Sequence, residues 1–192
     1  SCYFYMSWNP KYIFLILGVT AISYCSALAL EKSGSQGKKI ILLFTAVACL
    51  GTLFLFKYFN FFLENLCRSL ELFSIRLNPV TLRLILPVGI SFYTFQALSY
   101  VIDVYRGDIR AERHFGYYAA FITFFPQLVA GPIERTSHLL PQIKSPKSFE
   151  EPKAMDGLKM ILWGYFKKMV VADTLALYVD KIYGSLESYN GL

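Results

Sequence analysis

The stretch Tyr12–Leu30, YIFLILGVTAISYCSALAL, contains nineteen residues and no charged side chain. A second charge-free stretch of seventeen residues runs from Ile40 to Phe56, and Lys57 and an aromatic segment follow it. Each stretch is about as long as a helix that crosses a hydrocarbon core of roughly 30 Å. The two stretches predict membrane spans near residues 12–30 and 40–62.

The composition indicates a membrane protein as well. Hydrophobic residues make up 55% of the chain, the mean hydropathy is +0.44, and charged residues make up only 17%. Soluble domains contain about 25% charged residues. Aromatic residues reach 17%, which we expect where rings face lipid and lie at the membrane interfaces. The predicted fold is therefore an all-α, polytopic membrane bundle.

A cleaved signal peptide is the alternative interpretation of the first stretch, because Ala27-Leu28-Ala29 fits a cleavage pattern. The further apolar segments and the length of the stretch favour a span. The chain begins with Ser1 and ends without a closing element, so we expect residues 1–192 to form a single incomplete transmembrane domain of a longer protein.

The charges predict an orientation and exclude some partners. The net charge of +6 is scattered, and no basic run or glycine-rich phosphate loop suggests binding of nucleic acid. The short loop Glu31–Lys39 contains three lysines, which places it on the cytoplasmic side, with residues 62–83 on the other side. The four cysteines lack metal-ligand spacing, so we expect no disulfide and no metal site.

Residues 84–102 are predicted to form a third span, in which Pro87 and Gly89 weaken the start of the helix. Polar side chains inside a span suggest function, and hydrogen bonds between helices are the structural alternative. For Asp103, an ion pair with Arg106 is a further alternative. The polar stripe at positions i, i+3 and i+7, which should face inward, consists of Gln96, Ser99 and Asp103.

Three further elements are less regular. Residues 63–83 have the spacing of an amphipathic interfacial helix, although a solvated connector fits too. Residues 115–133 carry no charge but contain Pro126, Gly131 and Pro132, which predicts a broken or re-entrant element. Residues 157–179 predict an amphipathic or tilted helix, partly buried, with lysines at the cytoplasmic headgroups.

Three motifs in order resemble the membrane-bound O-acyltransferase family. They are LPVGISFYTFQALSYVIDVYRG at 86–107, FFPQLVAGPIERTSHLLPQI at 124–143 and LKMILWGYFKKMVVAD at 158–173. The nearest branch is the bacterial one around the alginate O-acetylation protein and the D-alanine transfer protein of teichoic acid modification. The resemblance covers about residues 3–183 and implies the N-terminal part of the fold of this family, with broken or re-entrant helices.

The resemblance implies an enzyme of the bacterial cytoplasmic membrane. Such an enzyme moves an acyl group from a cytoplasmic thioester, acetyl-CoA or an acyl carrier protein, to hydroxyls of an extracytoplasmic polysaccharide. No bound cofactor is expected; the expected partners are membrane lipid, the donor or carrier protein, and an extracytoplasmic acyltransferase or polymer-handling protein. The catalytic histidine of the family is expected beyond Leu192, so neither His114 nor His138 takes its place and no catalytic residue is assigned in residues 1–192.

Two questions stay open at this level. Gly131, Pro132, Ile133 and Arg135 match a Gly-Pro-Ile-x-Arg pattern, which forms either a wall of the donor entrance or a structural corner. Acetyl transfer competes with D-alanyl transfer and, in a different class, with a transporter or channel. The candidate residues of the donor entrance or channel are Gln96, Ser99, Asp103, Gly131, Pro132, Glu134 and Arg135.

Overall fold

The computed structural model describes residues 1–7, 9–71, 86–128, 131–146 and 148–185. These residues form helices and contain no β-strand, so the all-α prediction is confirmed. The chain divides into two units, Ser1–Ser145 and Pro146–Leu192, each of which is described by itself.

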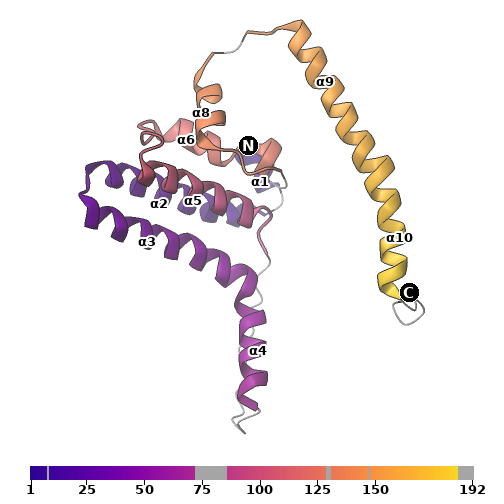
Figure 1. The fold of residues 1–192 in the computed structure, drawn as a ribbon, viewed down its shortest axis with the longest axis horizontal. Coiled ribbons are helices and arrows are strands. Elements are labelled where there is room, and N and C mark those ends of the chain that lie inside the picture. Colours follow the sequence, from indigo (N-terminus) through magenta and orange to yellow (C-terminus); the bar gives the residue numbers. More distant parts are fainter. Residues whose placement is uncertain (8, 72–85, 129–130, 147, 186–192) are drawn as a thin grey trace. The chain divides into compact units, whose positions relative to one another are not determined.

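In the first unit, helices α2, α3 and α5 lie side by side, and the short helix α6 packs against α2 and α5 (Figure 1). Helix α8 packs against α6. The helices of this unit are α1 (Cys2–Met6), α2 (Ile13–Lys32), α3 (Ser35–Leu53), α4 (Phe59–Glu71), α5 (Ile90–Arg106), α6 (Phe115–Ile122), α7 (Phe125–Leu128) and α8 (Thr136–Lys144).

Two helical stretches of the described residues are long and apolar enough to cross a membrane. One is Pro10–Lys32, which joins a short 3₁₀ turn to α2, and the other is Ser35–Glu71, which joins α3 to α4. The π-helical segment Phe54–Tyr58 connects α3 to α4, and the helix changes direction there (Figure 1). The predicted amphipathic segment 63–83 belongs to α4 as far as Glu71, and its remaining residues lie outside the described part of the chain.

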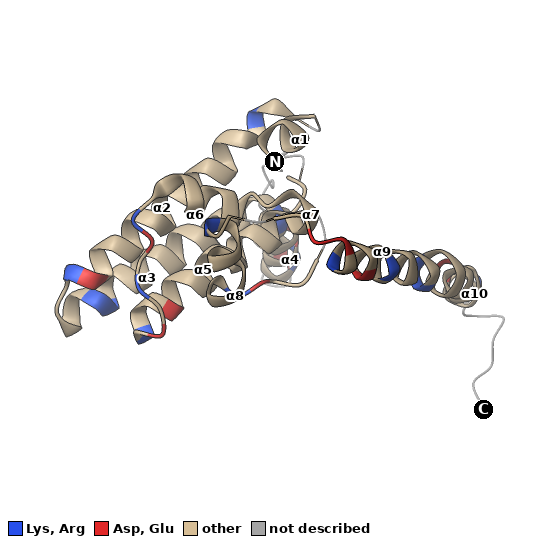
Figure 2. Cartoon of the chain, turned by 90° about the horizontal axis from the view of Figure 1, so that it is seen from above, with Lys and Arg blue, Asp and Glu red and all other residues tan. Residues whose placement is uncertain are grey.

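Charged residues gather at the ends of α2, α3 and α5 and leave the middles of these helices uncharged (Figure 2). Small polar residues instead join the helices between their ends. Thr45 of α3 donates a hydrogen bond to Ser26 Oγ of α2 at 2.7 Å. Short side chains of this kind let neighbouring helices approach closely in an apolar environment.

Tyrosines form the centre of the first unit. Tyr93, Tyr100 and Tyr118 are fully buried together with Phe121. The Tyr118 hydroxyl donates to Ser23 Oγ of α2 at 2.7 Å, and its ring lies 4.4 Å from that of Tyr100. We expected the aromatic residues at lipid and at interfaces, and for these four that expectation is wrong. The Tyr100 hydroxyl accepts a hydrogen bond from Glu112 N–H at 2.8 Å, so Tyr100 and Tyr118 both have a partner for the buried hydroxyl, whereas the Tyr93 hydroxyl makes no hydrogen bond among the described residues.

Two glycines in the left-handed region bound α5. Gly89, with φ of 74°, precedes Ile90, so Pro87 and Gly89 lie before the helix and not within it. Gly107, with φ of 82°, ends the helix, and Asp108 N–H donates to the Asp103 carbonyl at 3.0 Å. The third span was predicted at 84–102, of which residues 84–85 lie outside the described part of the chain.

The element predicted at 115–133 consists of two short helices. Helix α6 ends at Ile122, and α7 runs from Phe125 to Leu128. The eight residues of α6 extend for only about 12 Å at 1.5 Å per residue, well short of a hydrocarbon core. Residues 129–130 lie outside the described part of the chain, and Gly131 follows them.

The second unit is a helical rod. Helix α9 (Glu151–Tyr165), a π-helical segment (Phe166–Ala172) and α10 (Asp173–Gly184) follow one another. Its described residues include no buried side chain, so the part burial that we predicted for residues 157–179 is not found within this unit. Within the rod, Trp163 stacks on Phe166, with ring centroids 5.2 Å apart, and Lys168 pairs with Asp173.

Candidate functional site

A groove lies at the C-terminal end of α5, and we call it the α5 groove. Its volume is about 470 Å³. Apolar side chains of α3 and α5, among them Leu50 and Phe95, form part of its lining. The polar and charged part of the lining consists of Ser99, Asp103, Arg106, Asp108 and Arg135. The groove thus offers an apolar surface beside a charged one.

Three residues singled out in the sequence meet in this groove. Ser99 and Asp103 lie four residues apart on α5 and therefore share one face of the helix. Arg135 comes from the segment before α8, and its positive charge acts on the Asp103 carboxylate together with that of Arg106. The structure thus places two residues of the polar stripe, Ser99 and Asp103, in the same groove as the arginine of the next motif.

The ion pair considered between Asp103 and Arg106 is not formed. Within the described part of the chain, the Asp103 carboxylate is half-buried and makes neither a hydrogen bond nor an ion pair. Arg135 is exposed and likewise has no direct ion pair there. The groove therefore presents a carboxylate and a guanidinium whose hydrogen-bonding groups remain available to a ligand.

Gln96, the first residue of the polar stripe, lies elsewhere. It is buried, and its Nε2 donates to the Phe121 carbonyl of α6 at 3.3 Å. This bond joins α5 to α6 near the end of α6, where backbone carbonyls lack a partner within the helix. For Gln96 the structure supports the interhelical alternative.

The Gly131-Pro132 corner brings Arg135 to the groove. A Cβ atom at Gly131 would lie 3.1 Å from both Cα and Cβ of Gln127, so the chain passes close to α7 at this point. Pro132 is exposed, and Glu134 pairs with His138 Nδ1 at 3.3 Å along the start of α8. Arg135 itself is the extended residue before α8. The corner thus passes close to α7, and Arg135, which follows it, lines the α5 groove.

The segment 107–114, which we call the strap, connects α5 to α6 and packs against α2. Glu31, at the end of α2, accepts a hydrogen bond from Ala111 N–H at 2.6 Å and forms an ion pair with Arg113. Tyr24 of α2 donates to the Arg113 carbonyl at 2.6 Å. Sequence analysis missed these contacts, which place the predicted cytoplasmic loop 31–39 and the strap at the same end of the unit.

A second carboxylate holds the strap from the other side. Glu112 is buried, accepts a hydrogen bond from His114 N–H at 2.9 Å, and pairs with Lys144 of α8. Burial by itself would raise the pKa of Glu112, but Lys144 and the backbone N–H donors of His114 and Arg113 outweigh it and lower the pKa below its usual value. Glu112 is therefore ionised at neutral pH.

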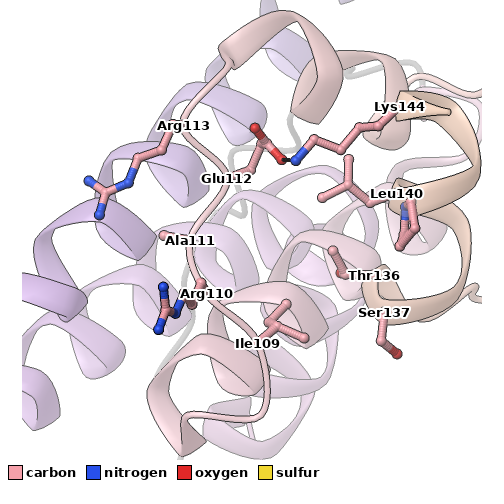
Figure 3. Close-up of a pocket in the computed structure, with 10 residues that line it drawn as sticks. Ile109, Arg110, Ala111, Glu112, Arg113, Thr136, Ser137, Leu140 and Lys144 are labelled. Carbon is pink, nitrogen blue, oxygen red and sulfur yellow. Dashed lines mark ion pairs between the residues drawn. The ribbon is translucent and has the colours of Figure 1, made fainter.

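The pair of Glu112 and Lys144 borders a cavity of about 460 Å³ between the strap and α8 (Figure 3). Thr136 and Leu140 of α8 line the same cavity. The Thr136 hydroxyl is buried and makes no hydrogen bond to the residues that the structure describes. The strap is thus held to α2 by Glu31 and to α8 by Glu112, and the cavity lies between the strap and α8.

The two histidines have local roles. His114 Nδ1 accepts a hydrogen bond from Tyr117 N–H at 3.4 Å and so caps α6. His138 pairs with Glu134 on the exposed face of α8. Neither lines the α5 groove. Among the described residues, no group of three His, Cys, Asp or Glu residues could hold a metal ion.

The chain is similar to three kinds of curated bacterial protein. It is 36% identical over 182 residues to a probable alginate O-acetylase of Pseudomonas aeruginosa, covering 94% of this chain and 35% of the relative. It is 33% identical over 209 residues to a peptidoglycan O-acetyltransferase of Helicobacter pylori, covering 94% of this chain and 38% of the relative. A teichoic acid D-alanyltransferase of Streptococcus thermophilus is 28% identical over 117 residues, covering 58% and 28%.

The chain spans a little over a third of the length of the two O-acetylating relatives. No family model matches it, and no solved structure matches it. The similarity to all three relatives therefore stands on sequence alone.

Proposed function

We propose that this chain, a homologue of the bacterial membrane-bound O-acyltransferases, is part of an enzyme that transfers an acyl group to a hydroxyl. The resemblance to this family is confirmed by relatives that are 33–38% identical over most of the chain. The names of these relatives carry the proposal, because they describe transfer of an acetyl group to alginate or peptidoglycan. Acetyl transfer to an extracytoplasmic polysaccharide is the specific reaction that we propose.

The α5 groove supports a role in holding the donor. Arg135 presents a planar fork of hydrogen-bond donors, which suits phosphate or carboxylate groups of acetyl-CoA or of an acyl carrier protein. The apolar part of the groove suits the uncharged arm of such a donor. We propose that this end of the unit faces the cytoplasm of a bacterium whose inner membrane the protein crosses several times.

The distribution of charge supports acyl transfer over transport. Transporters place ionisable groups near the bilayer midplane. In the described helices α2, α3 and α5, charged residues instead lie at the ends (Figure 2). Under this proposal the general base lies outside residues 1–192, so these residues position the donor and do not abstract the proton.

Transfer of a radiolabelled acetyl group by membranes that contain the full-length protein tests the proposal. We expect label from acetyl-CoA or from an acetylated carrier protein to enter polysaccharide, and label from a D-alanyl carrier to enter much less. The reverse preference would favour the activity named for the Streptococcus relative, and no transfer from any donor would overturn the proposal. Extracytoplasmic acyltransferase or polymer-handling partners are proposed to receive the acyl group, so the assay retains them.

The variant Arg135→Ala tests the proposal that the α5 groove holds the acyl donor. We expect KM for the donor to rise about tenfold or more, with kcat changed less, because the lost contacts bind the donor in both the ground and transition states. Arg135→Lys should recover only part of the loss, since an ammonium cannot replace the planar fork. Arg68→Ala, at an exposed arginine of α4, is the matched control. An unchanged KM in Arg135→Ala would return Arg135 to a structural role.

A further inference from the structure

We propose that the cavity between the strap and the start of α3 binds the phosphate of an anionic phospholipid headgroup. This cavity, which we call the strap cavity, has a volume of about 570 Å³. Its charged lining residues are Glu31, Lys38, Arg110 and Arg113. The proposal does not depend on the acyl-transfer reaction.

The strap cavity has a surplus of positive charge. Its one lining carboxylate, Glu31, is fully engaged, because one oxygen accepts from Ala111 N–H and the other pairs with Arg113. Lys38 and Arg110 have no carboxylate partner in the described part of the chain. Two cations that converge on one cavity without a counter-charge favour an anion between them.

Arg110 and Arg113 of the strap line this cavity and also the neighbouring cavity beside α8. Arg110 and Arg113 project from one side of the strap, whereas Glu112 points to the other side, toward Lys144 (Figure 3). Lys38 of α3 is half-buried and lines the same cavity. The fastening of Glu31 to Ala111 and Arg113 holds the strap in place, so the site is organised before any ligand arrives.

The neighbouring surface favours a lipid over a soluble phosphate. Two residues after Lys38, α3 begins to expose large apolar side chains, namely Ile40, Leu43, Phe44 and Val47. The headgroup of a phospholipid lies at the level where the acyl chains begin, and basic pockets at helix ends on the cytoplasmic side bind such headgroups. A lipid with its chains along α3 therefore places its phosphate at the height of Lys38 and Arg110.

Native mass spectrometry of the full-length protein with phosphatidylglycerol or phosphatidylcholine tests the proposal. We expect the double variant Lys38→Gln/Arg110→Gln to retain phosphatidylglycerol about tenfold less than the wild type, while phosphatidylcholine is unchanged. The control double variant Arg68→Gln/Lys181→Gln removes two exposed cations from α4 and α10 and should behave as the wild type. Equal retention in both double variants would overturn the proposal.

Two further measurements distinguish a loss of binding from a loss of folding, and a lipid phosphate from a soluble phosphate. The variant Lys38→Arg/Arg110→Lys keeps both charges and should keep most of the binding; its failure, with a normal melting curve, would contradict a charge-based site. Free coenzyme A in excess should not displace phosphatidylglycerol. If it displaces the lipid in the wild type and not in the Gln variant, the cavity binds a soluble phosphate and the assignment to lipid is overturned.

Discussion

Both units of the chain contain large aromatic side chains, which are buried in the centre of the first unit and exposed in the second. In residues 1–145, Tyr100, Tyr118 and Phe121 are fully buried between α2, α5 and α6. In residues 146–185, Trp163 and Tyr178 are each more than half exposed, and no described side chain is buried. The first unit has a core of its own, whereas the apolar surface of α9 and α10 needs lipid or another part of the protein to cover it.

The largest expected effect contrasts one tyrosine from each unit. Tyr118→Ala should destabilise the full-length protein by about 3–5 kcal/mol, since it leaves a cavity and removes the hydrogen bond to Ser23. Tyr178→Ala, at a position 64% exposed, should cost about 0.5 kcal/mol or less. Thermal unfolding in detergent measures both. A comparable loss for the two variants would show that α10 is packed against protein in the complete molecule.

The buried acidic residue of the strap comes next. Glu112→Gln should lower stability at neutral pH by about 1–3 kcal/mol, because it removes a charged partner of Lys144 and of the His114 N–H. The control Glu150→Gln, whose pair with Lys153 is exposed, should change stability by less than about 0.5 kcal/mol. Equal melting temperatures for the two variants would contradict the role given to the strap.

The lowered pKa of Glu112 predicts that the stability of the protein depends on pH. The folded pKa of Glu112 is lowered, so its stabilising effect is present above the ordinary pKa of a glutamate and is lost as the pH falls through the folded value. Wild type and Glu112→Gln should therefore differ at pH 7 and converge as the pH falls below about 4. Melting curves collected over this range check it, and a difference that persists into acid would contradict the assignment.

The smallest expected effects on stability come from two glycine-to-alanine substitutions, one in each unit, and they have opposite signs. Gly131→Ala should destabilise by about 1–2 kcal/mol, because its Cβ would lie 3.1 Å from Gln127 Cα. Gly157→Ala, with no described residue within 4 Å of the added Cβ, should stabilise α9 by about 0.5–1 kcal/mol. Helicity and melting temperature measure the pair. A loss of stability in both variants would indicate that a partner approaches α9 closely.

The sequence could predict the features that depend on neighbouring residues. The long charge-free stretches form α2 and α3, because a helix makes its backbone hydrogen bonds within itself and is therefore stable in an apolar environment. Ser99 and Asp103 share a face because residues four apart on a helix do so. The break after Ile122 could be anticipated from Pro126, Gly131 and Pro132, which interrupt the same stretch of sequence.

Features that depend on tertiary contacts could not be predicted. Glu31 and Ala111 are 80 residues apart, and nothing in the local sequence pairs them. Arg135 and Asp103 line the same groove although they lie on different segments of the chain, and no local pattern brings them together. The burial of Tyr118 depends on Ser23, which lies on another helix and is 95 residues away in the sequence. In each case the missing information is which helix lies beside which.

Accessibility of single cysteines tests most directly the claim that the strap end of the first unit faces the cytoplasm. In a full-length background without other cysteines, Ser35→Cys and Ser137→Cys mark that end, and Ser69→Cys marks the far part of α4. An impermeant thiol reagent should label Ser69→Cys in intact cells and should label the other two only after permeabilisation. Labelling of Ser35→Cys and Ser137→Cys in intact cells, with Ser69→Cys protected, would reverse the orientation and contradict donor entry at the α5 groove.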